Sequence, residues 1–587
     1  MSRCSARATG NRGGTGAPCR CGWPRATPRG GADPANSSSA SSAPQPSLAR
    51  LQLTGCSASA RLSLSWLPAL CSVDLACTQL TDLGDWALAG CPALAELALP
   101  ACLARIRDMA LADCALASLE LGHTALVSIG SCAFMRCRRL ARVAVPATLA
   151  AVAPLAFVGC ARLAALAWAH TALAQVCAGT FYGCVALRRV ELPAALASIG
   201  AHAFAKCAAL VEVRWPAALA ELGDGAFFGC AALPSLELSH TALGAVGAGA
   251  FGGCAALAAL APPASLRSVG AYAFARCTSL RDVRWPAALA QLGHGAFQRC
   301  PALRALDLAP TGLAALATEA FYGCTALEAV RLPDGLVRVD GHAFAGCTAL
   351  ARVRWPATLA EVDGAAFLGC TTLAALDLAH TALTRLGTVA FWGCTALAAV
   401  ELPATLVELC GAAFSHCTSL TSLDLGRCSA PGLTLGDSAF AGCTALARAT
   451  LPSALERVGE GAFAQCAALR SVVFVGGGPC RSGRLWARAH SSSSRWPPWA
   501  APLGPSPYGA PWACAHCSRS RWPLRAASLR VHWSQGAGGR WARAHCSSSM
   551  WPPWAATLQV PAHGVEKVLV RLEPERVRVL DKAVGVG

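Results

Sequence analysis

Apolar residues along the chain recur with a period of 23 or 24 residues, broken once by a spacing of 26. Cysteine marks this period, and 15 of the 17 phenylalanines stand three residues before one of the periodic cysteines. These cysteines are Cys91, Cys114, Cys137, Cys160, Cys184, Cys207, Cys230, Cys254, Cys277, Cys300, Cys324, Cys347, Cys370, Cys394, Cys417, Cys443 and Cys466. A period of this length is typical of a solenoid built from stacked coils.

The coil that ends at Cys230 shows which elements the pattern predicts. Val213 and Trp215 alternate with polar neighbours, which predicts a short strand. Pro216 should end this strand, because proline donates no ladder hydrogen bond. Phe227 and Cys230, with the alanine before them, have helical spacing. We therefore expect an α/β repeat solenoid, with short parallel strands on one face and short helical or 3-10 returns on the other.

A single coil is too small to fold alone. Burying its roughly eight apolar side chains at ~2 kcal/mol each does not offset an ordering cost of ~1.5 kcal/mol per residue. Stacked coils share buried faces and strand hydrogen bonds, so the stability of the array should be collective.

Two motifs relate the repeat to a known family. Strands end in Leu-Pro, as at Leu192-Pro193, Leu332-Pro333 and Leu402-Pro403, and returns read Ala-Phe-x-x-Cys. The 24-residue coils carry the leucine-rich repeat pattern from Leu233 to Leu243, with Thr241 where Asn or Cys is usual. Over about residues 80–475 the chain resembles the BspA-like leucine-rich repeat family. The resemblance implies a curved solenoid that binds proteins, often at a cell surface or as an adhesin, and implies no enzymatic activity. The 17 periodic cysteines predict about 17 coils.

The flanks do not keep the period. We expect residues 1–50 to be a disordered basic Gly/Ser/Pro-rich leader, residues 51–475 to be the solenoid, and residues 476–587 to be an Arg/Trp/Pro-rich low-complexity tail, mostly disordered. The leader has no apolar run of signal-peptide length, and a transit peptide is the alternative to plain disorder. The tail repeats a 16-residue segment, 486–501, at 541–556. Two interpretations stay open: an arm that binds nucleic acid or membrane, and repetitive DNA translated in a shifted frame.

Charge separates the solenoid from its flanks. The formal net charge is +17. Residues 1–50 contribute +6 and residues 476–587 contribute +11, while residues 51–475 hold 27 basic and 27 acidic residues. The solenoid therefore lacks the overall basic charge of a nucleic-acid binder. Residues 238–266 carry no charge, but they keep the repeat register through Phe251 and Cys254. We therefore expect no transmembrane segment there.

The outward strand positions are the candidate partner-binding face. They stand seven residues after each periodic cysteine and carry charge of mainly alternating sign. The candidates are Glu191, Arg214, Glu237, Arg284, Asp307, Arg331, Arg354, Asp377 and Glu401. One interpretation is cross-strand ion pairing, which contributes little energy but favours solubility. The other is a partner-binding face, flanked by small residues at Ala305, Ala329 and Ala375.

Other candidate chemistry is weak. The periodic cysteines should form a buried ladder of free thiols that act as small apolar groups. His170, His240 and His380 lie at least three coils apart, too far to share a zinc ion. Cys514 and Cys517 form a lone C-x-x-C. No nucleophile–base pair or phosphate loop is evident, so we predict no catalytic residue, metal or cofactor.

The functional expectation is therefore non-enzymatic protein recognition, with a cell-surface or adhesin-like protein as the first hypothesis. An intracellular scaffold that uses the same face is the alternative. Nucleic-acid or membrane binding through the basic tail is a weaker third hypothesis. The sequence names neither the protein partner nor the compartment.

Overall fold

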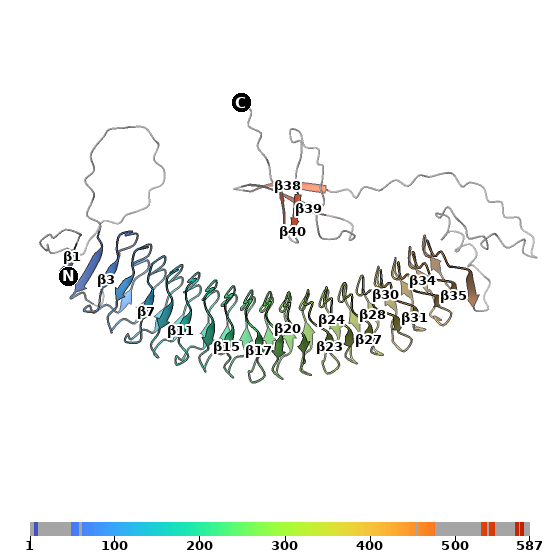
Figure 1. The fold of residues 1–587 in the computed structure, drawn as a ribbon, viewed down its shortest axis with the longest axis horizontal. Coiled ribbons are helices and arrows are strands. Elements are labelled where there is room, and N and C mark those ends of the chain that lie inside the picture. Colours follow the sequence, from blue (N-terminus) through green and yellow to red (C-terminus); the bar gives the residue numbers. More distant parts are fainter. Residues whose placement is uncertain are drawn as a thin grey trace, which may run out of the picture. The chain divides into compact units, whose positions relative to one another are not determined.

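A computed structural model describes residues 5–9, 48–57, 62–452 and 455–475, and the strand backbones at 530–536, 539–545, 570–573 and 576–579. Between residues 48 and 475 the chain winds into about 18 coils, which stand side by side in one curved row (Figure 1). The predicted leucine-rich repeat solenoid of parallel strands is confirmed over this part of the chain.

Each coil contributes one longer strand to what we call the long-strand ladder. Neighbouring strands that pair do so in parallel and in chain order, and the pairing is interrupted between some of the coils. The strands are β2 (Arg50–Thr54), β3 (Ser72–Asp74), β5 (Glu96–Ala98), β7 (Ser118–Glu120), β9 (Arg142–Ala144), β11 (Ala165–Ala167), β13 (Arg189–Glu191), β15 (Glu212–Arg214), β17 (Ser235–Glu237), β19 (Ala259–Ala261), β21 (Asp282–Val283), β23 (Ala305–Asp307), β25 (Ala329–Arg331), β27 (Arg352–Arg354), β29 (Ala375–Asp377), β31 (Ala399–Glu401), β33 (Ser422–Asp424), β35 (Arg448–Pro452) and β37 (Ser471–Val475).

A second row of two-residue strands, which we call the short-strand ladder, was not predicted from the sequence. It also pairs in parallel from coil to coil. The strands are β4 (Asp82–Leu83), β6 (Arg105–Ile106), β8 (Ser128–Ile129), β10 (Ala151–Val152), β12 (Gln175–Val176), β14 (Ser198–Ile199), β16 (Glu221–Leu222), β18 (Ala245–Val246), β20 (Ser268–Val269), β22 (Gln291–Leu292), β24 (Ala315–Leu316), β26 (Arg338–Val339), β28 (Glu361–Val362), β30 (Arg385–Leu386), β32 (Glu408–Leu409), β34 (Thr434–Leu435) and β36 (Arg457–Val458).

The predicted helical or 3-10 returns are wrong, because the described residues contain no helix. The return before Cys207 is a series of tight turns in which successive N–H groups alternate between two uses. Phe204 donates to the carbonyl of Ala226 in the next coil at 2.7 Å, whereas Cys207 donates locally to Phe204 at 3.3 Å. The φ angles of His202 (55°) and Lys206 (60°) are positive, which a right-handed helix excludes. These turns bond each coil to the next, which a helix would not do.

The core is a pair of side-chain stacks that run the length of the row. Phenylalanine rings from Phe134 to Phe463 stack coil on coil, with neighbouring centroids 4.9 to 5.5 Å apart and planes within 4 to 18°. Beside them lies the cysteine ladder, in which each Sγ–H donates to a carbonyl of the preceding coil, as from Cys207 to Phe181 at 3.3 Å. The predicted ladder of free thiols is buried from Cys91 to Cys443, and Cys466 at its end is half-buried.

Strands also occur in both flanks. β1 (Ser5–Thr9) pairs antiparallel with β2. A separate compact unit at residues 502–587 holds two hairpins, β38 (Arg530–Gly536) with β39 (Gly539–His545) and β40 (Val570–Glu573) with β41 (Arg576–Val579). The rest of the predicted disordered leader and tail, including Cys514 and Cys517, lies outside the described residues. No helix in the described part of the chain is long and apolar enough to cross a membrane.

Candidate recognition face

The nine predicted face residues all lie on the outer side of the long-strand ladder, and all are exposed. They occupy the third strand position, or in Arg284 the residue that follows β21 and bridges to Asp307. The middle position of each strand points inward instead, as with Val330, which is 2% exposed. Period-two alternation in a strand thus places every one of these charges on the same side. We call this set of nine residues the charged file.

Strand pairing sets which members of the charged file are neighbours. Glu191 pairs with Arg214, and Asp307 pairs with Arg331. The first pair is bonded at 3.0 Å (Arg214 Nη1 to Glu191 Oε1) and the second at 3.4 Å (Arg331 Nη1 to Asp307 Oδ2). Because these side chains are more than half exposed, each ion pair contributes little to folding. For these four residues the predicted cross-strand pairing is found.

Towards the C-terminal coils the sign stops alternating. Arg331 pairs in register with Arg354, and Asp377 pairs with Glu401. Like charges on facing positions repel rather than stabilise. Of the ion-pair distances in the described residues, only that from Asp377 Oδ1 to His380 Nδ1, 3.9 Å, involves Arg354, Asp377 or Glu401. This part of the file is thus not explained by cross-strand pairing.

Further charged residues belong to this surface and were missed from the sequence, among them Asp424 and Arg352. Asp424 pairs in register with Glu401 and extends the acidic run by one coil. It stands seven residues after Cys417, so the same count would have found it. Arg352 lies at the first position of β27, on the same side as Arg354. Arg352 could have been predicted from the sequence, because it lies two residues before Arg354 and period-two alternation places both on the same side of the strand.

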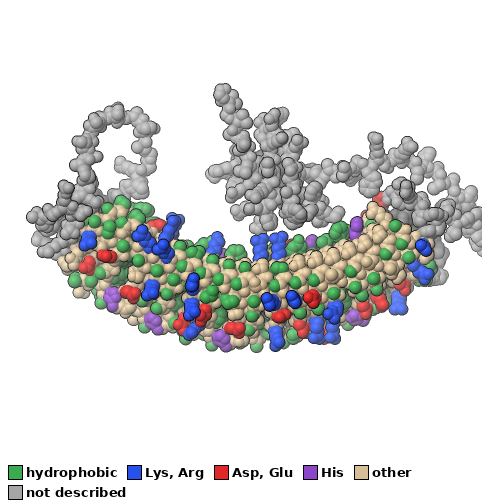
Figure 2. Space-filling model, viewed as in Figure 1, with side chains coloured by type: hydrophobic (Ala, Val, Ile, Leu, Met, Phe, Trp, Pro, Cys, Tyr) green, Lys and Arg blue, Asp and Glu red, His purple; other side chains and the backbone are tan. Residues whose placement is uncertain are grey.

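Beside the charged file the strands carry short side chains. Ala305 and Ala329 pair in register at the first strand position, and Ala375 pairs with Ala399. With methyl groups at these positions, a partner can approach the strands closely. In Figure 2 the acidic side chains lie mainly in the lower half of the visible face, where Figure 1 labels many of the long strands, and basic side chains lie both there and along the upper rim.

Trp215 and the three periodic histidines make contacts within the solenoid. Trp215 is 8% exposed and packs edge-on against Phe227, with centroids 5.1 Å apart. His240 Nε2 lies 2.9 Å from the carbonyl oxygen of Trp215, and His170 and His380 make the same contact one coil back. Within the described residues no group of three His, Cys, Asp or Glu side chains is placed to hold a metal ion.

The buried thiols of the cysteine ladder are unreactive at neutral pH. Burial raises the pKa of Cys207 and of Cys324 to about 12. The thiolate is the reactive form of cysteine, so these side chains stay protonated at neutral pH. Near the C-terminal end of the ladder, the neighbouring thiol of Cys466 and burial together raise the pKa of Cys443.

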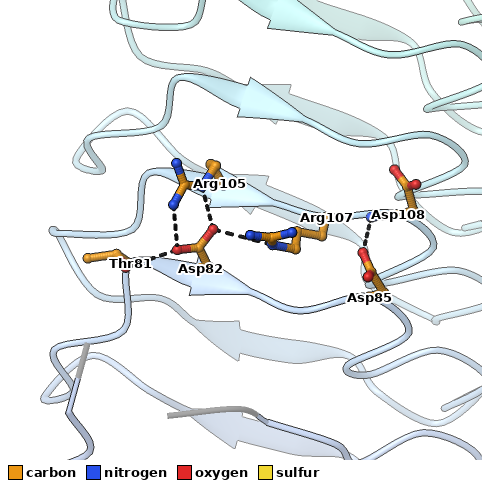
Figure 3. A network of polar contacts seen from close by, with 6 residues as sticks. All are labelled: Thr81, Asp82, Asp85, Arg105, Arg107 and Asp108. Carbon is orange, nitrogen blue, oxygen red and sulfur yellow. Dashed lines mark hydrogen bonds and ion pairs between the residues drawn. The ribbon is translucent and has the colours of Figure 1, made fainter. Parts of the chain in front are cut away.

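The short-strand ladder carries its own polar contacts, as a network in the early coils shows (Figure 3). Asp82 accepts hydrogen bonds from Arg105 and Thr81, and lies 3.4 Å from Arg107. The hydrogen bond from Arg105 is the main reason that the pKa of Asp82 is lowered. Asp85 accepts the backbone N–H of Asp108 in the next coil at 3.2 Å. These residues connect neighbouring coils, and their polar groups are already paired with one another.

The chain resembles known proteins along the solenoid. A family model described as BspA type leucine rich repeat region matches residues 69–173, 174–304, 244–374, 314–429 and 376–477. A leucine-rich repeat protein from Bacteroides ovatus is 28% identical, with a TM-score of 0.47, over 60% of this chain and 82% of that one. A leucine-rich cell surface protein from Faecalibacterium prausnitzii is 22% identical, with a TM-score of 0.29, over 67% and 87%. A T. pallidum leucine-rich repeat protein is 26% identical, with a TM-score of 0.25, over 32% and 77%. No protein of curated function matches the chain.

Proposed function

The chain belongs to the BspA-type leucine-rich repeat family, and from this premise we propose that it is a non-enzymatic protein-binding solenoid whose partner contacts the charged file. The observation that carries the proposal is the C-terminal half of the file. There the exposed charges Arg354, Asp377 and Glu401 face neighbours of the same sign across the ladder. Such an arrangement costs stability within the chain and is relieved when a partner brings the opposite charges.

The arrangement of sign suggests what the partner presents. Arg331, Arg352 and Arg354 form a basic block on two adjacent strands. Asp377, Glu401 and Asp424 form an acidic block on the next three. We propose a protein partner with an acidic patch beside a basic one, in the order that complements these blocks. Charge complementarity of this kind fixes orientation and raises the association rate more than it raises affinity.

The solenoid suits this role because the charged side chains stand on strands that are held in place by packing and hydrogen bonds. Each file residue follows an inward-facing strand residue, as Arg331 follows the buried Val330, and the strands are hydrogen-bonded to one another within the basic block and within the acidic block. A preorganised surface loses less entropy on binding than a mobile one. The flanking alanines keep the strand backbone within reach of the partner.

The test is charge reversal within the full-length chain. Proteins that co-purify after mild crosslinking are compared between the unsubstituted chain, the variant D377R/E401R, and the control E361R. Glu361 is exposed on the outer side of the short-strand ladder, so reversing it changes net charge without touching the file. A partner that is lost with D377R/E401R and retained with E361R supports the proposal. If every co-purifying protein is retained by both variants, the charged file is not the recognition surface.

Where the protein works is a separate part of the proposal. The family resemblance favours a surface or extracellular role, and an intracellular scaffold would use the same face. Labelling intact cells with a membrane-impermeant reagent, followed by peptide mass mapping, distinguishes the two. Labelled solenoid peptides indicate a surface protein. Unlabelled solenoid peptides, together with a labelled surface control, indicate the scaffold.

A further inference from the structure

The C-terminal compact unit, residues 502–587, carries a positive charge that the solenoid lacks. It holds 11 Lys and Arg residues against 4 Asp and Glu residues, a net charge of +7, whereas residues 51–475 are balanced at 27 of each sign. A basic excess confined to one unit is typical of a module that binds a polyanion. The described hairpins of this unit, β38 with β39 and β40 with β41, show how the charges are arranged.

The register of the first hairpin separates its residues into two faces. Residues that pair across the strands share a face, and successive pairs alternate between the two faces. One face holds three pairs: Arg530 with His545, His532 with Arg543, and Ser534 with Trp541. The other face holds Val531 with Ala544, Trp533 with Ala542 and, beside the turn, Gln535 with Arg540. The first face is therefore basic, and the second is apolar except next to the turn.

The second hairpin divides in the same way. One face holds the apolar pairs Val570 with Val579 and Leu572 with Val577. The other face holds the charged pairs Arg571 with Arg578 and Glu573 with Arg576. We call this charged face, together with the face of the first hairpin that holds Arg543, the basic hairpin faces.

Like charges are paired on the basic hairpin faces. Arg571 is in register with Arg578, and Arg543 is in register with His532, which adds a second positive charge when it is protonated. Among the residues of these four strands the only acid is Glu573. Like charges at directly opposed positions destabilise a sheet. A polyanion that lies along these faces removes the repulsion, so the pairing favours an anionic ligand.

The two hairpins lie together, with β39 beside β41. Hairpins placed in this way can bury their apolar faces against each other, which leaves the basic hairpin faces for a ligand. A membrane-binding surface instead needs an apolar face that is free to enter the lipid. The arrangement therefore favours a soluble polyanion over a lipid surface.

An aromatic residue stands among the charges of the first hairpin. Trp541 shares its face with Arg543, which is two residues further along β39. Proteins that bind single-stranded nucleic acid combine basic groups, which follow the phosphates, with aromatic rings, on which the unpaired bases stack. Trp541 and Arg543 provide both kinds of group on one face.

We propose that the basic hairpin faces bind single-stranded nucleic acid. Trp541 stacks on an unpaired base, and Arg543, Arg571 and Arg578 contact phosphate groups. This activity goes beyond the proposed protein recognition, because it uses a different unit of the chain and a different class of ligand.

The experiment is a fluorescence-anisotropy titration of a labelled thymidine dodecanucleotide with the full-length protein over a range of salt concentrations. R571A/R578A should weaken binding about tenfold and should reduce the slope of log affinity against log salt by about 1.4, because two phosphate contacts are lost. W541A should also weaken binding about tenfold but leave the slope unchanged, because stacking releases no counterions.

Two further variants serve as controls. R138A/R139A removes the same charge from exposed positions of the solenoid, so it should leave affinity and slope unchanged. R571K/R578K keeps both charges and should keep the slope. It separates the loss of phosphate contacts from a loss of hairpin structure.

Several results would overturn the proposal. The first is no saturable binding of the oligonucleotide at physiological salt, or an equal loss of affinity in R571A/R578A and R138A/R139A. The second is equally tight binding of inorganic polyphosphate together with no effect of W541A, which would assign the faces to polyanions in general. The third is tighter binding of a DNA duplex of the same length, and the fourth is binding of phosphatidylserine vesicles without binding of the oligonucleotide.

Discussion

The ring of Phe204 stacks on the ring of Phe227 in the next coil, with 5.0 Å between centroids and 11° between planes. Every ring inside the stack has two such neighbours, so each coil completes the core of the coils beside it. No coil holds a core of its own, which makes the stability of the solenoid a property of neighbouring coils.

The adjacent residues Phe227 and Phe228 provide a direct test of this account. Phe227 is fully buried, and Phe228 is 45% exposed. Phe227→Ala should lower the free energy of unfolding by about 3–5 kcal/mol, because it leaves a cavity in the stack. Phe228→Ala should cost less than about 1 kcal/mol. Urea unfolding followed by circular dichroism measures both, and equal losses would contradict the assignment of the stack as the core.

The close approach of neighbouring coils predicts how a second pair of substitutions changes stability. A Cβ at Gly223 would lie 2.7 Å from the backbone nitrogen of Ala201, in the preceding coil. Gly223→Ala should therefore destabilise the protein by about 1–3 kcal/mol through overpacking. Gly244→Ala is the control, since a Cβ there meets nothing within 4 Å. Thermal unfolding of the two variants measures the difference. A neutral Gly223→Ala variant would show that the coils are not packed this closely.

The cysteine ladder predicts a pH dependence of stability. Burial raises the pKa of Cys324 from 9.0 to about 12. In the unfolded chain the thiol ionises above about pH 9, while the folded chain keeps its proton to about pH 12. Unfolding therefore releases protons in this window, and stability should fall as pH rises through it. Replacing ladder cysteines such as Cys324 with alanine should reduce the slope of unfolding free energy against pH between 9 and 12.

Thiol labelling at neutral pH gives a separate prediction for the same ladder. Cys324 is buried, whereas Cys71 and Cys77 are exposed. Brief treatment of the native protein with iodoacetamide should modify Cys71 and Cys77, and should modify Cys324 only after denaturation. Peptide mass spectrometry measures the labelled fraction of each. Rapid modification of native Cys324 would contradict a closed ladder.

The network around Asp82 predicts an acid-sensitive contact in the early coils. Its pKa is lowered, mainly by the hydrogen bond from Arg105, so its stabilising effect is present near neutral pH and is lost as pH falls below about 3.8. Asp82→Asn should lower the unfolding midpoint slightly at pH 7, and this difference should shrink as pH falls below 3.8. Glu120→Gln, at an exposed strand position, is the control. An effect of Asp82→Asn that does not shrink as pH falls below 3.8 would be contrary to this account.

Much of this architecture follows from the sequence because its signals are periodic. The spacing of the cysteines and phenylalanines predicts the stacking of the coils. The alternation of Val213 and Trp215 with polar residues predicts the strand of that coil. Proline after the strand and inward leucines complete the coil. The outward placement of the charged file follows from the same alternation.

Other features were not predictable because they leave no distinct pattern. Phe227 and Cys230 have a spacing that suits both a helix and two successive turns, and the sequence does not show the positive φ of residues such as His202 and Lys206. A two-residue strand such as β16 is too short to alternate, so the short-strand ladder was missed. Which charges in the file are paired depends on side-chain conformation as well as on register.

The central claim is that a protein partner contacts the charged file, and site-specific photocrosslinking tests it most directly. A photoreactive residue is placed at Ala399, which is exposed at the first position of β31 beside Glu401, or at Val407, which is 39% exposed beside the short-strand ladder. The account predicts a discrete crosslinked protein from position 399 that is absent from position 407 and is competed away by the unsubstituted chain. Crosslinks from position 407 alone, or none from position 399, would contradict the claim.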